Sequence, residues 1–221
     1  DGHWFIGVAA LVALGQLPTA GVTVSGNTLT AVDVGSGNGA ISITTDGPGV
    51  RDIRVTGNHV LGADDAGVLL RIHGTGGTIS DVVIADNDIL SSCRVERSCA
   101  SVFLDRIAPT ATFANVAIDR NTLAGGGRYG FWLEGATVSV AARDNVVAPH
   151  AAGPFNFAAP ATFVEYSRNS PVTFLQLDLL GRSGVGAGSL QACADCRRTN
   201  PCRGGGNGAL ALRASGSWKC R

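Results

Sequence analysis

The 221-residue sequence contains no methionine and a single lysine, Lys219. Aromatic residues make up 6% and charged residues 15% of the chain, whereas about a quarter of a typical globular domain is charged. These shortages exclude a disordered chain, a coiled coil and a charged helical bundle, because all three depend on charged side chains. Basic and acidic residues number 17 each, so no net charge attracts nucleic acid or an anionic membrane.

Long apolar runs are also missing. The longest, Trp4–Leu14, has 11 residues, and about 20 are needed to span a bilayer. We therefore expect no membrane span, and interpret this run as a buried first coil or a capping helix. The chain begins at Asp1 without methionine, so we expect a processed or truncated chain, such as a mature protein after removal of a signal peptide.

The even number of cysteines favours a secreted, extracellular protein with disulfides. We expect the pair Cys93 and Cys99 to form a bridge within one loop. The other four could form two disulfides in any of three pairings, or a four-thiolate zinc site. Disulfides are favoured because Cys93 and Cys99 lie apart from these four and are most simply explained as a bridge. If that pair is oxidised, we expect the other four cysteines to be oxidised too. These four are Cys193, Cys196, Cys202 and Cys220.

A turn motif recurs between residues 20 and 170. Each copy has a short alternating strand, then Gly, Asp or Arg before an asparagine, then an aliphatic residue. We expect a tight turn at the asparagine, because this residue tolerates left-handed backbone angles and bonds its own backbone. Stacked at about 4.8 Å, equivalent asparagines would form a side-chain ladder. They are Asn27, Asn58, Asn87, Asn121 and Asn145, with a further copy at Asn169.

A second set of alternating strands lies between the copies. We expect these strands at 40–45, 67–72, 101–107 and 130–134. Three short strands in every 24 to 34 residues is the period of a parallel β-helix, in which one face of each strand lines a dry interior. The alternative is an antiparallel sandwich built from hairpins.

With these repeated turns, the chain resembles the right-handed parallel β-helix proteins of the pectate-lyase-like superfamily. The resemblance implies an all-β solenoid with coils over residues 1–169, of which 1–21 form a first coil or N-terminal cap. Residues 170–221, rich in glycine, cysteine and arginine, would be a disulfide-stapled C-terminal cap. The superfamily includes lyases, hydrolases and structural proteins, so the resemblance does not identify an activity.

Alternation along the second strand set predicts two outward columns on successive coils. The first column carries Phe103 and Trp132, which we expect to be exposed and to stack on a sugar ring. The full first column is Ser42, Leu69, Phe103 and Trp132. The second is Thr44, Arg71, Asp105 and Glu134.

The second column suggests acid–base chemistry. Asp105 and Glu134 would raise the pKa of one carboxyl, while Arg71 would keep the other ionised. We therefore predict Arg71, Asp105 and Glu134 as catalytic residues, and Trp132, Phe103 and His73 as substrate-binding residues. The same three charged residues could instead form a surface ion ladder.

Two functions remain open. The protein could bind an extended polysaccharide along this flank and cleave it, or be a structural subunit that self-associates in an extracellular assembly. An ice-binding surface is a weaker idea, because only Thr44 falls in the column. No cofactor is expected, although Asp46, Asp64 and Asp65 could hold calcium.

Overall fold

A computed structural model describes most of the chain, and the expected first coil at Trp4–Leu14 lies outside the described residues. The described part is all-β apart from one helix, and most of its strands belong to three parallel sheets. The described residues are 19–30, 39–46, 49–95, 99–134, 136–148, 150–157 and 163–221.

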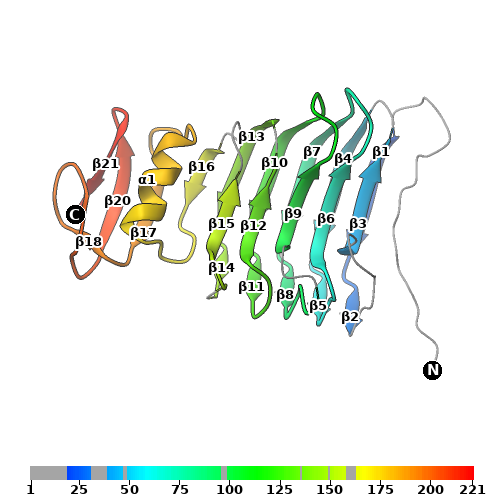
Figure 1. Ribbon diagram of the computed structural model, residues 1–221, viewed down its shortest axis with the longest axis horizontal. Coiled ribbons are helices and arrows are strands. Elements are labelled where there is room, and N and C mark those ends of the chain that lie inside the picture. The colour runs from blue at the N-terminus through cyan, green and yellow to red at the C-terminus, as the bar shows by residue number, and fades with distance from the viewer. Residues whose placement is uncertain are drawn as a thin grey trace.

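The three parallel sheets run along the length of the molecule (Figure 1). Sheet A contains β1 (Thr19–Ser25), β4 (Val50–Thr56), β7 (Thr78–Ala85), β10 (Thr112–Asp119), β13 (Ala136–Arg143) and β16 (Phe163–Ser167). Sheet B contains β2 (Thr28–Thr30), β5 (His59–Leu61), β8 (Asp88–Leu90), β11 (Thr122–Ala124) and β14 (Val146–Val147). Sheet C contains β3 (Gly39–Thr45), β6 (Ala66–Ile72), β9 (Ala100–Arg106), β12 (Tyr129–Leu133) and β15 (Gly153–Phe157).

The chain visits sheets A, B and C in turn and then adds the next strand to each. This order is compatible with a β-helix. Each pairing within the three sheets is parallel, so the antiparallel sandwich is wrong for β1 to β16. The second strand set is confirmed as β3, β6, β9 and β12.

Stacked aliphatic side chains fill the interior between the sheets. In sheet A, Ile53, Val82, Val116 and Val140 are in register on four successive strands, and each is at most 1% exposed. Burying such a side chain contributes about 1.5–3 kcal/mol. The core can therefore be built with few aromatics. The residues of sheet C that alternate with the two predicted outward columns are also buried: Ile41, Ile43, Val68, Leu70, Val102, Leu104, Phe131 and Leu133.

The repeated asparagines form a ladder, as predicted. The side-chain amide of Asn58 donates to Oδ1 of Asn87 at 2.9 Å, and the backbone N–H of Asn58 donates to the same oxygen at 2.9 Å. The same pair of bonds joins each asparagine to the next: Asn27, Asn58, Asn87, Asn121, Asn145 and Asn169.

The left-handed backbone of each turn lies one residue earlier than expected. The residue before the asparagine, and not the asparagine, has the positive φ. Asparagine is thus required for its hydrogen bonds, while the turn angle falls on its neighbour. These neighbours are Gly26, Gly57, Asp86, Arg120, Asp144 and Arg168, with φ between 54° and 67°. Both arginines among these neighbours pair with the carboxylate at the preceding turn, Arg120 with Asp86 and Arg168 with Asp144.

The parallel sheets give way to a different C-terminal structure (Figure 1). Helix α1 (Phe174–Arg182) begins at a capping box formed by Thr173 and Gln176. Two small antiparallel sheets follow. One contains β17 (Leu190–Cys193), β20 (Ala209–Ala214) and β21 (Ser217–Cys220), and the other contains β18 (Cys196–Arg197) and β19 (Arg203–Gly204).

Three disulfides join the six cysteines. Cys93 pairs with Cys99 in one loop, as predicted, and the tail contains the two bridges Cys193–Cys196 and Cys202–Cys220. These bridges fit an extracellular protein. No described helix is long and apolar enough to cross a membrane.

Candidate functional site

The predicted charged column is present on sheet C. Thr44 is in register with Arg71, and Arg71 with Asp105. The backbone N–H of Glu134 donates to the carbonyl oxygen of Leu104 at 2.8 Å, which places Glu134 beside Asp105 on the next coil. Alternation along four strands therefore brings one guanidinium and two carboxyls together.

Asp105 lies between the other two charged side chains and interacts with both. Nε of Arg71 lies 2.5 Å from Oδ2 of Asp105, and both side chains are largely buried. Burial raises the pKa of the Glu134 carboxyl, and the charge of Asp105 and a hydrogen bond with Asp105 raise it further, while Arg71 opposes the shift. The Glu134 carboxyl therefore binds its proton more tightly than an exposed carboxyl does.

The spacing of the two carboxyls bears on whether they could hydrolyse a glycosidic bond. A retaining glycosidase holds its two carboxyls about 5–5.5 Å apart, and an inverting one about 6.5–9.5 Å apart, to leave room for the sugar and the water. Here Glu134 is hydrogen-bonded to Asp105, and Arg71 occupies the other carboxyl. The arrangement provides a set of hydrogen-bonding groups on one flank of sheet C.

The aromatic column differs from the prediction in one important respect. Phe103 was expected to be exposed, but it is 9% exposed, and Leu69 beside it is 1% exposed. Both pack with Ala66 and Ala100 in a second hydrophobic cluster on sheet C, separate from the main core. Phe103 therefore supports its neighbours by packing and does not offer a surface to a ligand.

Trp132 covers this cluster and remains half-buried. Its ring stacks on that of Phe103, with centroids 5.0 Å apart and an interplanar angle of 23°. Tyr129, which the sequence did not suggest as a site residue, meets Trp132 edge-on at 5.5 Å. The guanidinium of Arg128 lies 5.7 Å from the Tyr129 ring. The accessible aromatic surface is thus formed by Trp132 and Tyr129.

A break in the strand alternation explains why Tyr129 was missed. The ladder pairs Tyr129 with Ala100 and Phe131 with Val102, and the residue between them has no partner. A Cβ on Gly130 would lie 2.5 Å from Cγ1 of the buried Val147, so this position faces the interior. Because Gly130 and Phe131 both face inward, Tyr129 reaches the same side as Trp132. The register with β9 is the same on both sides of Gly130, so no residue is inserted, and a glycine within the strand is the available sequence signal for this local irregularity.

The remaining predicted site residues do not lie together in one site. His73 is exposed directly after β6, and in the described part of the chain nothing links its side chain to the charged column. Asp46 follows the end of β3, whereas Asp64 and Asp65 precede β6. Since β3 and β6 are parallel neighbours, these carboxylates lie at opposite ends of the sheet. They do not form the calcium site considered from the sequence.

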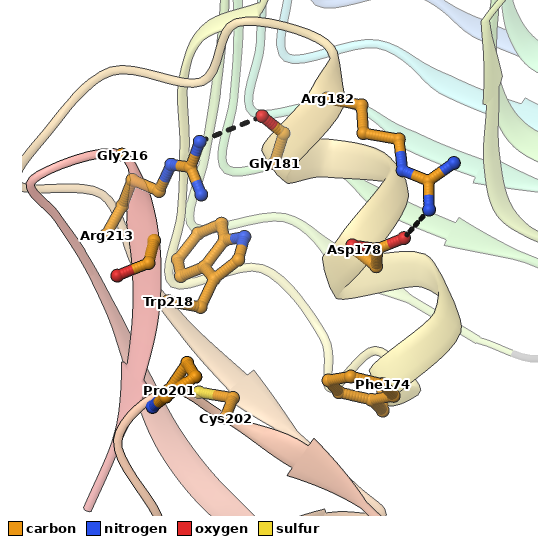
Figure 2. A pocket seen from close by; sticks show the side chains of 10 residues that line it. Phe174, Asp178, Gly181, Arg182, Pro201, Cys202, Arg213, Gly216 and Trp218 are labelled. Atoms are coloured by element: carbon orange, nitrogen blue, oxygen red, sulfur yellow. Dashed lines mark hydrogen bonds and ion pairs between the residues drawn. The ribbon is translucent and has the colours of Figure 1, made fainter.

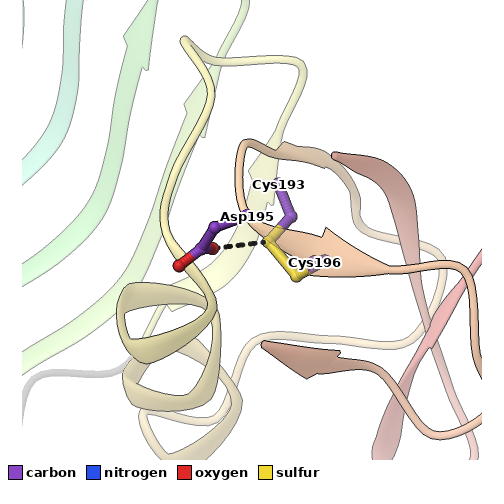
Figure 3. A group of neighbouring side chains, drawn as sticks. All are labelled: Cys193, Asp195 and Cys196. Atoms are coloured by element: carbon purple, nitrogen blue, oxygen red, sulfur yellow. Dashed lines mark hydrogen bonds between the residues drawn. A yellow bond between two sulfur atoms is a disulfide. The ribbon is translucent and has the colours of Figure 1, made fainter. Parts of the chain in front are cut away.

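One Cys–Asp–Cys cluster lies in the C-terminal region (Figure 3). The two cysteines, Cys193 and Cys196, are bonded to each other and offer no thiolate. Oδ1 of Asp195 accepts a hydrogen bond of 2.5 Å from the backbone N–H of Phe174, the first residue of α1. The cluster therefore fastens the helix start to the disulfide loop, and the zinc alternative is not supported.

A buried serine–histidine contact lies near the loops of sheet C. Oγ of Ser101 is 3.2 Å from Nε2 of His150 and 2.9 Å from Oγ of Ser92. Nδ1 of His150 contacts the carbonyl oxygen of Ala148 at 2.7 Å. Burial lowers the pKa of His150, and this backbone bond opposes the shift. Ser101 is 0% exposed, so a substrate cannot reach its hydroxyl.

Comparisons with protein families, curated proteins and solved structures found no match to this chain. The superfamily suggested by the repeat is therefore not shown.

Proposed function

We propose that this protein is a secreted, right-handed parallel β-helix that binds an extended polysaccharide along sheet C without cleaving it. The cyclic order of the three sheets supports the β-helix. Right-handedness is supported by the strong general preference of crossovers between parallel strands. Secretion is supported by the three disulfides.

The half-buried Trp132, with Tyr129 at its edge, carries this proposal. An aromatic ring offers the apolar face on which a sugar ring stacks. Phe103 fixes the orientation of the indole from beneath. A rigid aromatic loses little conformational entropy on binding.

The charged column supplies polar groups on the same strands. Arg71, Asp105 and Glu134 lie in the column next to that of Phe103 and Trp132. Sugar hydroxyls can donate to the carboxylate and accept from the guanidinium. The contact between Glu134 and Asp105 favours binding over cleavage, because a glycosidase holds its two carboxyls about 5 Å or more apart.

A glycan-binding screen with the wild-type chain tests the proposal. We expect an extended polysaccharide to be retained and no shortened product to appear. Trp132→Ala should weaken binding about fivefold or more through lost stacking, and Tyr129→Ala should weaken it less. Leu210→Ala removes an exposed apolar side chain in the C-terminal region and should leave affinity unchanged. Failure to bind any glycan, or equal binding by Trp132→Ala, would contradict the proposal. Release of oligosaccharides would contradict the non-catalytic assignment.

Self-association is the second candidate, because one end of the three sheets is open among the described strands. β1, β2 and β3 each pair with a described strand on one side only. Such edges can pair with another chain. Sedimentation velocity over a range of protein concentrations would detect end-to-end association. A monomer at all concentrations would exclude this candidate.

A further inference from the structure

A cleft separates α1 from the β20–β21 hairpin in the C-terminal region (Figure 2). Its volume is about 260 Å³, slightly below the usual range of ligand pockets, about 300–1,000 Å³. Phe174 and Pro201 contribute apolar surface, and Arg213 and Trp218 contribute polar groups. The cleft has room for one sugar-sized group and not for a chain of sugars.

Two hydrogen-bond donors converge over Gly181 on the helix wall. A Cβ at Gly181 would lie 3.1 Å from Nη1 of Arg213 and 3.1 Å from Nε1 of Trp218. The other guanidinium nitrogen, Nη2, donates to the carbonyl oxygen of Gly181 at 2.9 Å. This bond holds Arg213 in place, with its guanidinium 5.7 Å from the centre of the Trp218 ring.

The indole N–H of Trp218 has no hydrogen-bond partner among the described residues. Trp218 is only 6% exposed, and a buried unpaired N–H carries an uncompensated loss of hydration. Figure 2 shows this nitrogen on the side of the ring that faces α1. An acceptor oxygen bound over Gly181 would satisfy it.

The charges in the cleft favour an anionic acceptor. Asp178 is paired with Arg182 at 2.5 Å, whereas Arg213 has no carboxylate partner in the described part of the chain. Residues 182–221 contain seven arginines and lysines against a single acidic residue, Asp195. One positive charge therefore remains for a ligand.

From these observations we infer that the cleft binds the carboxylate of a sugar acid, with Arg213 and the Trp218 N–H as donors. Phe174 and Pro201 would contact the sugar ring. This site shares no residue with sheet C, so the inference does not depend on the function proposed above.

Titration with D-glucuronate, followed by the indole N–H signals in a ¹H–¹⁵N NMR spectrum, tests the inference. Trp218→Phe identifies the signal of Trp218. We expect this signal to move downfield and saturate, because its proton gains a charged acceptor. Glucose at equal concentration should not move it. Absence of a saturable shift with glucuronate would overturn the inference. Equal affinity for acetate would overturn the sugar-acid assignment and leave a simple carboxylate site.

Variants of residues in the cleft distinguish a loss of glucuronate binding from a loss of folding. Arg213→Gln should weaken glucuronate binding about tenfold or more, because a charge-assisted bond is lost. Gly181→Ala should abolish binding by filling the space between the donors, while alanine favours the helix. Arg203→Gln removes a charge from an exposed residue of the same region and serves as the control. Unchanged affinity in folded Gly181→Ala, or an equal loss in Arg203→Gln, would overturn the inference.

Discussion

Gln191 occupies the place in the asparagine ladder that follows Asn169. The backbone N–H of Asn169 donates to Oε1 of Gln191 at 3.2 Å. The Gln191 amide in turn donates to the carbonyl oxygens of Asn169, Ser170 and Ala192. The side chain is fully buried. The Gln191 side chain thus adds to the backbone bonds that join the end of the parallel sheets to the C-terminal structure.

Replacing this glutamine should destabilise the whole protein. Gln191→Leu keeps similar volume but leaves buried groups unpaired, so we expect a loss of about 2–4 kcal/mol in the free energy of unfolding. Urea denaturation measures this loss. Gln176→Leu, in the helix capping box, is the control and should cost about 1 kcal/mol. Equal losses would show that Gln191 has no special linking role.

The position of each asparagine along the ladder should determine how much it contributes to the free energy of unfolding. Asn121 accepts from Asn87 and donates to Asn145 and to the carbonyl oxygen of Ile84, and it is 1% exposed. Asn121→Ala should therefore cost about 3–4 kcal/mol. Asn27→Ala, at the half-exposed end of the ladder, should cost about 1 kcal/mol. The same denaturation experiment compares them, and similar losses would argue against a cooperative ladder.

The parts of the fold that depend on strand alternation could be predicted from the sequence. Period-two alternation placed Val68 and Val102 inside, and it brought Arg71 next to Asp105, because equivalent residues of parallel strands stack in register. The repeated asparagines fixed the phase of successive coils. These features depend on neighbouring residues or on a motif that recurs along the chain, so they can be recognised in one sequence without related sequences.

Other features depend on contacts that alternation does not specify. The exposure of Phe103 was predicted wrongly, because its burial comes from neighbours on other coils such as Leu69 and Trp132. Gly130 and Phe131 both face inward, so Tyr129 lies on the outer side, against the simple period. The pairing of the tail cysteines also depends on three-dimensional proximity, since four cysteines allow three pairings.

The disulfides should differ in their contribution to stability. Cys202 and Cys220 are separated by 18 residues, and Cys93 and Cys99 by 6. Because the longer bridge restricts the unfolded chain more, replacing both cysteines by serine should cost about 3 kcal/mol for Cys202–Cys220 and about 2 kcal/mol for Cys93–Cys99. Thermal unfolding of the two double variants measures this order. A larger loss from the shorter bridge would contradict the entropic explanation.

The charged column should make stability fall as pH rises. The pKa of Glu134 is raised in the folded protein, first by burial and then by Asp105, so the folded state binds this proton more tightly than the unfolded state. The resulting stabilisation is complete below the unfolded pKa, about 4.3, and is lost as pH rises through the folded pKa.

Glu134→Gln should remove this dependence, because an amide resembles the protonated acid and cannot ionise. Relative to the wild type, the variant should gain stability between about pH 4 and neutral pH. Asp81→Asn provides a control of opposite sign, since hydrogen bonds from Asn115 and Ser80 lower the pKa of Asp81. Its stability relative to wild type should fall as pH rises towards the unfolded pKa of about 3.9 and stay constant above it. Urea denaturation at several pH values on both sides of about pH 4 tests both variants. A constant difference between Glu134→Gln and wild type would show that the raised pKa of Glu134 contributes nothing to the stability of the column.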